Sequence, residues 1–260
     1  MKWSLNYIAI TNSPEEARIL DECGIQQVMV DTEILGKVDR QKGKQTIISD
    51  HKIEDVTKLK ELQLNLEIIC RINPFNENIF NEINQAVLAG ADFIMIPMIK
   101  NIEEYKLIVD HIDRRTKIIP LIETTYSLFN LKEIIEYSNI KQIHFGLNDL
   151  FIDIGYKNLF EILFSEFFSC FINFAVNNVE IVGIGGIGNP KVPLKVDSLL
   201  LLSEFLNLKS SSIILSRSFF KNGYDKQSII EGLRMFEDVF KDSKKYRNLV
   251  LLKEQVQRLN

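Results

Sequence analysis

The sequence predicts an α/β protein that folds as one (β/α)8 TIM barrel, and three observations favour this architecture. The chain has 260 residues, a usual length for a single barrel of this kind. Short β-rich segments alternate with helical patterns along the whole chain. The predicted strands are almost continuously apolar, as expected for parallel strands that are buried on both faces. An open doubly wound sheet is the main alternative, and the length also allows two small domains.

Eight short apolar segments are predicted to be strands, and helical patterns separate them. The predicted strands lie at 5–10, 27–30, 68–72, 93–96, 117–122, 142–145, 181–184 and 212–215. The predicted helices lie at 14–23, 51–62, 79–88, 102–112, 128–137, 159–174, 199–206, 227–240 and 248–257. Because no linker or low-complexity segment interrupts this alternation, we expect residues 1–260 to form one domain with a helical C-terminal segment at 226–260.

Local signals support individual helices. Ser13 is a favourable N-cap residue, and Pro14 suits the first position of the helix that follows it. Gly24 then provides a C-terminal stop, and Gly90 does the same after the helix at 79–88.

The segment 159–174 is the most apolar part of the chain. Five phenylalanines recur there at helical spacing: Phe160, Phe164, Phe167, Phe171 and Phe174. Glu161, Glu166 and Asn173 interrupt the segment, which argues against a membrane span. We therefore expect a helix whose broad aromatic face packs in the core, with a subunit interface as the alternative.

Composition excludes several classes of protein. The net charge of −4 provides no electrostatic basis for binding nucleic acid or an anionic membrane. The three cysteines, Cys23, Cys70 and Cys170, are widely separated, so neither a disulfide framework nor a zinc site is indicated. The N-terminal apolar stretch at 7–10 is too short for a signal peptide. A cytoplasmic protein is the expectation.

Polar side chains lie at or just beyond the ends of four of the predicted strands. They are Asp31 and Glu33 after the second strand, Arg71 at the end of the third, Glu123 after the fifth, and Asn148 and Asp149 after the sixth. Because active sites of barrels lie at the carboxyl ends of the strands, we expect these side chains to converge at one mouth.

Two carboxylates from neighbouring strands suit a hard cation such as Mg²⁺, which prefers oxygen ligands. We expect Glu123 and Asp149 to bind Mg²⁺ or Mn²⁺, which would stabilise a developing enolate. Arg71 would hold the carboxylate of a 2-oxo acid. The alternative is that the two acids cap the following helices and that Arg71 forms a structural ion pair with Glu123 or Asp31.

Four segments, in this order and spacing, resemble the aldolase and citrate lyase β-subunit superfamily, to which the 4-hydroxy-2-oxoheptanedioate-type aldolases belong. They are Arg71-Ile-Asn-Pro, Gly90-Ala-Asp-Phe-Ile-Met-Ile-Pro-Met, Leu121-Ile-Glu-Thr and Gly146-Leu-Asn-Asp-Leu-Phe-Ile-Asp-Ile-Gly. The resemblance covers about residues 28–155. Members of this superfamily are metal-dependent barrels that form or use enolates derived from pyruvate or acetyl groups.

The resemblance implies roles for individual residues. Glu123 and Asp149 match the two metal-binding carboxylates, and Arg71 matches the arginine that holds the substrate's carboxylate or carbonyl oxygen. Pro97 belongs to the segment whose end lines the substrate pocket. We expect Asp31 and Asn148 to contact the substrate as well.

The segment after the second strand departs from the family's patterns. The aldolase branch has Gly-Glu-His there, with the histidine taking part in proton transfer, whereas this chain has Asp31-Thr32-Glu33-Ile34. Asp31, Glu33, Lys37 and Arg40 partly match the citrate lyase branch. The proton-transfer candidates are therefore Glu33 or Asp31 acting through water, and His51, for which a surface position is the alternative.

Three further signals are weaker. Gly183, Gly185 and Gly188 spell a dinucleotide-binding motif, but Pro190 follows where a helix should open, so a turn that offers N–H groups to a substrate anion is the better interpretation. His144 is expected to be a structural barrel residue. Lys100 follows the fourth strand, where a Schiff-base lysine would be redundant beside a metal pair.

The expected activity is that of a metal-dependent carbon–carbon lyase of the aldolase type, acting on a small 2-oxo acid. An acyl-thioester lyase of the citrate lyase or malyl-coenzyme-A type is one alternative. A non-catalytic barrel subunit that binds a small 2-oxo acid is the other. The terminal helices and the phenylalanine-rich helix favour a homo-oligomer, and no nucleic-acid or membrane partner is expected.

Overall fold

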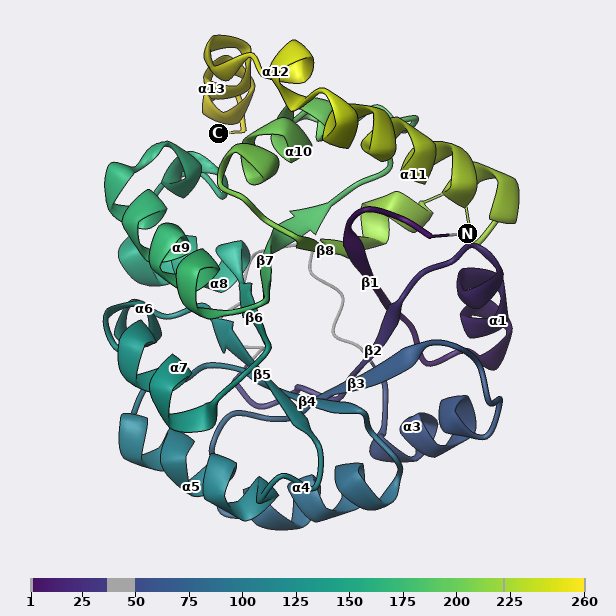
Figure 1. Ribbon diagram of the computed structural model, residues 1–260, viewed down its shortest axis with the longest axis vertical. Helices are drawn as coiled ribbons and strands as arrows, with labels where there is room; N and C mark the ends of the chain where they lie inside the picture. Colours follow the sequence, from purple (N-terminus) through teal and green to yellow (C-terminus); the bar gives the residue numbers. More distant parts are fainter. Residues whose placement is uncertain (1, 37–49, 222, 260) are drawn as a thin grey trace.

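Eight parallel strands close into a barrel in sequence order, from β1 next to β2 through β8 next to β1 (Figure 1). The computed structural model describes residues 2–36, 50–221 and 223–259. The strands are β1 (Asn6–Ile10), β2 (Gln27–Asp31), β3 (Glu67–Arg71), β4 (Phe93–Ile96), β5 (Lys117–Ile122), β6 (Gln142–Phe145), β7 (Ile181–Ile187) and β8 (Ser212–Leu215). The predicted (β/α)8 barrel is confirmed.

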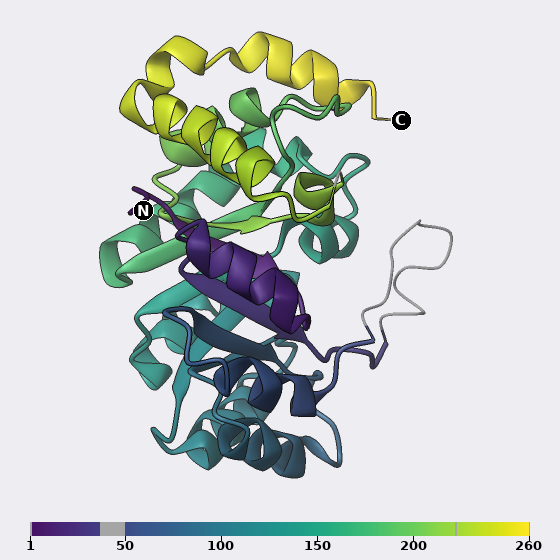
Figure 2. The same cartoon turned by 90° about the vertical axis from the view of Figure 1, so that its right-hand side faces the viewer.

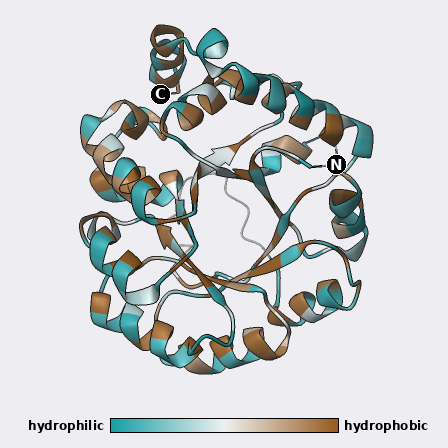
Figure 3. Ribbon diagram, viewed as in Figure 1, coloured by the Kyte–Doolittle hydropathy of each residue, from teal (hydrophilic) through white to brown (hydrophobic). Residues whose placement is uncertain are grey.

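Helices surround the barrel and turn their apolar faces towards it (Figures 1 and 3). They are α1 (Pro14–Glu22), α3 (Ile53–Lys60), α4 (Ile79–Leu88), α5 (Ile102–Ile112), α6 (Thr125–Phe129), α7 (Leu131–Ser138), α8 (Leu147–Ile154), α9 (Glu166–Asn178), α10 (Ser198–Asn207), α11 (Lys226–Lys241), α12 (Ser243–Tyr246) and α13 (Leu249–Gln257). Two 3₁₀ turns, η1 (Glu161–Phe164) and η2 (Arg217–Phe220), precede α9 and follow β8. Ser13 caps α1 with Pro14 at its first position, as predicted.

The inside of the barrel is layered along its axis. At its amino end, the side-chain amides of Gln27 and Gln142 donate hydrogen bonds to each other at 3.0 and 2.9 Å. Above them lies a separate apolar cluster that includes Ile8, Met29 and Ile69. These side chains fill the interior of the barrel, so the polar groups at the carboxyl ends of the strands lie above a packed apolar layer.

The C-terminal segment is helical, as predicted, and it covers one side of the barrel. Helix α11 lies outside β8 and β1, and α12 and α13 follow beyond α10 (Figures 1 and 2). Asp225 caps α11 by accepting a hydrogen bond from the Ser228 N–H. Leu233 and Phe236 of this helix are fully buried, so their side chains pack the helix against the core.

Some element boundaries differ from the predictions. The helix expected at 128–137 is two helices, because Thr124 and Ser127 form a capping box that starts α6 earlier. The sequence patterns missed α8, although Gly155 ends it in the left-handed conformation that favours glycine. The phenylalanine-rich helix begins only at Glu166, after η1. Strand β7 extends to Ile187, so no helix opens at the glycine motif.

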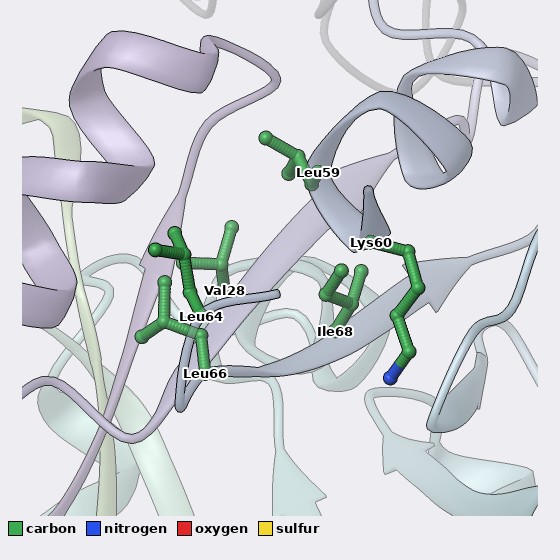
Figure 4. A pocket seen from close by; sticks show the side chains of 6 residues that line it. All are labelled: Val28, Leu59, Lys60, Leu64, Leu66 and Ile68. Carbon is green, nitrogen blue, oxygen red and sulfur yellow. The ribbon is translucent and has the colours of Figure 1, made fainter. Parts of the chain in front are cut away.

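Within the described ranges, no helix has the length and apolar character required to cross a membrane. A small hollow lies outside the barrel between α3 and strands β2 and β3, lined mainly by Leu59, Leu64 and Leu66 (Figure 4). Its volume of about 50 Å³ suits a few water molecules rather than a substrate. A larger hollow of about 440 Å³ lies between the 156–165 segment and α13. The polar groups that the sequence singled out lie instead at the carboxyl ends of the strands, where barrels carry their active sites.

One prediction concerns the close contact between β6 and β7. A Cβ atom on Gly183 would lie 2.1 Å from Nδ1 of the buried His144, whereas one on Gly186 would meet nothing nearer than 3.6 Å. We expect Gly183→Ala to lower the free energy of unfolding by about 1–3 kcal/mol or more, because the core cannot accept the added methyl group. Gly186→Ala, its matched control, should change it by less than about 1 kcal/mol. Urea denaturation measures both, and equal effects would contradict the proposed steric origin.

Candidate active site

A buried ion pair joins the carboxyl ends of β2 and β3. Asp31 and Arg71 are register partners, and Arg71 donates from Nε and Nη2 to the two carboxylate oxygens of Asp31 at 2.8 and 2.7 Å. Their side chains are 3% and 15% exposed. Burial opposes the charge of Arg71, but Asp31 and then Glu33 outweigh it and raise the Arg71 pKa, so the guanidinium stays ionised. The ion pair considered as the alternative for Arg71 therefore exists, with Asp31.

Glu33 lies beside this pair, in the turn that follows β2. Its Oε2 atom is 3.6 Å from Nε of Arg71, and its side chain is only 2% exposed. Asp31 and Glu33 thus reach the same side of the chain, as period-two alternation predicts. A second carboxylate is therefore buried next to a guanidinium that Asp31 already contacts through two hydrogen bonds.

Glu123 follows β5 directly and is buried, with 3% exposure. Its Oε1 accepts a hydrogen bond from the Met98 N–H at 2.9 Å. Met98 has a φ of 49°, in the left-handed region that a methionine rarely adopts. Such a conformation costs about 1 kcal/mol or more, so the surrounding structure holds this N–H in place.

Three effects raise the pKa of Glu123 to about 8: burial first, then the negative charges of Glu33 and Asp149. Arg71 and the Met98 N–H act in the opposite direction but do not cancel them. The carboxylates at this mouth thus outnumber the positive charge that faces them, among the residues that the structure describes.

Asp149 reaches the site from the first turn of α8, whose N-cap is Gly146. A Cβ atom at Gly146 would lie 2.9 Å from Oε2 of Glu123 and 3.0 Å from its Cβ. A glycine is therefore required for α8 to approach β5 this closely. Asn148 lies in the same turn and is half-buried, while Pro97 is buried directly after β4. Thr124, rather than Glu123, caps α6, so Glu123 is not a helix cap.

His51 also lies next to the ion pair. Its Nδ1 accepts a hydrogen bond from the Asp31 N–H at 3.0 Å, which places the ring proton of the neutral imidazole on Nε2. Burial lowers the pKa of His51, against the opposing charges of Asp31, Asp50 and Asp55. The ring is half-buried and not on the open surface. His51 therefore lies at the mouth of the barrel and not at the surface position considered as the alternative.

Other sequence-predicted residues lie apart from these groups. His144 is buried inside the barrel, where Nε2 contacts the Gly185 carbonyl oxygen at 3.0 Å and burial lowers its pKa to about 4. It is a neutral residue of the barrel interior. Lys100 is exposed in the loop before α5. Lys37 and Arg40 lie outside the described residues.

Sequence reasoning missed three contributors to the site. The Met98 N–H could not be found, because it depends on an unusual backbone angle. Arg217 comes two residues after the end of β8, a position that could have drawn attention to it, and its charge opposes protonation of His51. Asn73, two residues beyond Arg71 in the quoted motif, binds the backbone beside Glu33.

A divalent cation would find two carboxylates here. Among residues 2–36, 50–221 and 223–259, no group of three or more His, Cys, Asp or Glu side chains is arranged to hold a metal ion. A pair of carboxylates nevertheless suits Mg²⁺, which takes its remaining oxygen ligands from water and substrate.

The chain matches the model of a known protein family. The family model described as HpcH/HpaI aldolase/citrate lyase matches residues 11–169. None of the curated proteins shows a significant match.

Solved structures of similar fold include an HpcH/HpaI aldolase from Desulfitobacterium hafniense DCB-2, with a TM-score of 0.61, 13% identity, and coverage of 82% of this chain and 86% of that one. An HpcH/HpaI aldolase/citrate lyase family protein from Burkholderia cenocepacia J2315 has a TM-score of 0.63 and 12% identity, with 85% and 91% covered. The citrate synthase SbnG has a TM-score of 0.59 and 15% identity, with 94% and 95% covered. At these identities, the structural likeness shows the fold alone.

The raised pKa of Glu123 predicts how stability depends on pH in protein freed of metal with a chelator. The folded state keeps the Glu123 proton up to about pH 8, whereas the unfolded state loses it near the ordinary value of 4.5. Between these values the folded state binds more protons, so the free energy of unfolding should fall as pH rises, by up to about 1.4 kcal/mol per pH unit from this group. Glu123→Gln should remove this slope in denaturation curves from pH 5 to 8. An unchanged slope would show that Glu123 ionises normally.

Proposed function

Because the chain belongs to the HpcH/HpaI aldolase/citrate lyase family, we propose that it is a carbon–carbon lyase of the aldolase type that cleaves or forms a bond beside a pyruvate-like 2-oxo acid with Mg²⁺ or Mn²⁺. The observation that carries this proposal is the buried carboxylate of Glu123, whose pKa is raised to about 8 by burial and then by the negative charges of Glu33 and Asp149, although Arg71 opposes the shift. A bound cation would remove this electrostatic penalty.

Glu123 and Asp149 are the residues that would hold the cation. Oε1 of Glu123 accepts the Met98 N–H, so the carboxylate has a fixed orientation with Oε2 directed near Gly146, the N-cap of the helix that carries Asp149. The donor set is made of carboxylate oxygens, which hard divalent cations prefer. When bound, the cation would supply Lewis-acid stabilisation of negative charge that develops on the substrate's C2 oxygen.

Arg71 would fix the acid group of the substrate. Its bonds to Asp31 use Nε and Nη2, and we assign Nη1 to the substrate's carboxylate or carbonyl oxygen. Asp31 would act on the substrate indirectly, by holding the guanidinium plane in one orientation. Asn148 and Pro97 would line the substrate pocket from the start of α8 and the end of β4.

Glu33 is the proton-transfer group that the geometry favours. Asp31 is the poorer candidate, because both of its oxygens accept hydrogen bonds from Arg71. In the cleavage direction, Glu33 would accept the proton of the substrate's 4-hydroxyl group, directly or through water, while the C3–C4 bond breaks and the electrons move towards C2. Returning a proton to C3 then completes the pyruvate product. His51 is the second candidate, since its Nδ1 already contacts the backbone of Asp31.

The substrate would thus be a small acid. We further propose that the protein is cytoplasmic and forms a homo-oligomer, with no nucleic-acid or membrane partner. The exposed aromatic rings of Phe129 and Phe167, 5.5 Å apart, support self-association. An acyl-thioester lyase remains the second candidate function, favoured by the Asp31-Thr32-Glu33 sequence after β2.

The proposed metal and substrate roles predict the behaviour of two variants. Asp149→Asn should lower Mg²⁺ affinity by at least about 10-fold and kcat/KM for release of pyruvate from a 4-hydroxy-2-oxo acid by at least about 100-fold. Arg71→Ala should lower kcat/KM similarly but retain Mg²⁺ binding. Calorimetry with Mg²⁺ alone, and with oxalate in its presence or absence, measures the two kinds of binding.

Glu136→Gln removes an exposed carboxylate of α7 and serves as the control. Wild-type activity in Asp149→Asn would contradict the metal role. Cleavage of an acyl-thioester instead of the oxo acid would favour the second candidate function, and oxalate binding that ignores Mg²⁺ would favour a non-catalytic barrel.

The proton-transfer assignment predicts a different pattern. Glu33→Gln should lower kcat by about 10²–10⁴-fold, since a general base contributes this much, with Mg²⁺ affinity changed far less. His51→Gln should have the smaller effect on kcat. Steady-state kinetics at saturating Mg²⁺ checks both, and the reverse order of the two variants would transfer the role to His51.

A further inference from the structure

We propose that Asn73 and Glu82 are positioning residues that form a buried clamp on the turn carrying Glu33. This inference rests on the proposed function in one respect, the assignment of proton transfer to Glu33. The clamp itself is defined by hydrogen bonds, and the hydrogen-exchange test of these bonds does not require that assignment.

The turn that carries Glu33 needs an anchor, because it lies beyond the end of β2 and contributes little to the core. Ile34 and Leu35 are 52% and 46% exposed, although both are large apolar residues. Burial of these side chains therefore does not hold the turn, while the carboxylate between Thr32 and Ile34 is almost fully buried. Polar contacts must position it.

The Asn73 side chain supplies these contacts from the end of β3. Its Oδ1 accepts hydrogen bonds from the N–H groups of Ile34 and Leu35, both at 2.9 Å. Its Nδ2 lies 3.5 Å from the Thr32 carbonyl oxygen. One carboxamide thus contacts the backbone on both sides of Glu33.

Glu82 fixes Asn73 in turn. From α4, its Oε1 accepts hydrogen bonds from the backbone N–H of Asn73 at 2.9 Å and from its Nδ2 at 3.0 Å. The second bond also determines which end of the carboxamide faces the turn, since Nδ2 must point to Glu82. Glu82 is only 6% exposed, and burying a carboxylate is costly unless such donors compensate.

The clamp sets Glu33 relative to Arg71 because both depend on the same strand end. Thr32 donates to the Arg71 carbonyl oxygen from its backbone N–H at 3.0 Å and from its hydroxyl at 2.8 Å. Asn73 is two residues further along the chain. These hydrogen bonds and those of Asn73 therefore tie the Glu33 turn to the strand end that carries Arg71, where the two side chains lie 3.6 Å apart.

The first test measures amide hydrogen exchange at Ile34 and Leu35. Asn73→Ala removes the acceptor of both amides, so their exchange should accelerate at least about 10-fold, while β3 and β5 amides keep wild-type rates. Glu82→Gln keeps an Oε1 acceptor and is the matched control, with little acceleration expected. Glu82→Leu removes the acceptor and should resemble Asn73→Ala. Unchanged exchange at both amides in Asn73→Ala would overturn the clamp.

The second test asks whether the clamp acts through Glu33. Asn73→Ala should lower kcat at least about 10-fold with Mg²⁺ affinity within about 2-fold of wild type, and Glu82→Gln should retain most of the activity. In a Glu33→Gln background, Asn73→Ala should cause little further loss, because the group it positions is already gone. An equal loss in both backgrounds would overturn the positioning role. If wild-type protein does not cleave oxo acids, the proposed function fails while the exchange measurement still decides the clamp.

Discussion

The ion pair between Asp31 and Arg71 is the interaction on which the candidate site depends. It places the guanidinium in the barrel mouth with two of its nitrogens already engaged, and so with one orientation. Removing one partner of a buried ion pair typically costs about 3–5 kcal/mol, because the remaining charge loses its closest opposite charge. Its position follows from strand register, since Asp31 and Arg71 face each other where β2 and β3 end. Glu33, Glu123 and His51 are all arranged around this pair.

Around it, the protein holds more negative charge than the arginine neutralises among the described residues. The raised pKa of Glu123 reflects its burial first and this excess of negative charge second. Local features maintain it against repulsion: the left-handed backbone of Met98 directs an N–H to Glu123, and Gly146 lets the helix carrying Asp149 approach. Such features are typical of a site that is less stable alone than with its ligand.

The barrel could be predicted because each βα unit carries its own signals. Apolar runs identified β4, β5, β6 and β8 to the residue, and Ser13 and Pro14 marked the start of α1. Helix α8 escaped prediction because its sequence, directly after β6, resembles a continued apolar strand with loop residues. The early start of α6 escaped because its capping box uses serine in place of the more usual glutamate.

The (β/α)8 architecture and the strand ends at which Asp31, Arg71 and Glu123 emerge can be inferred from the sequence, since periodicity and strand order are local properties. The pairing of the polar groups at those strand ends depends on the three-dimensional arrangement. Arg71 binds Asp31 rather than Glu123, and His51 accepts the Asp31 N–H from 20 residues away. The clamp of Asn73 and Glu82 on the Glu33 turn has the same origin. Such contacts depend on angstrom-scale distances set by the closure of the barrel, and these distances have no counterpart in residue spacing.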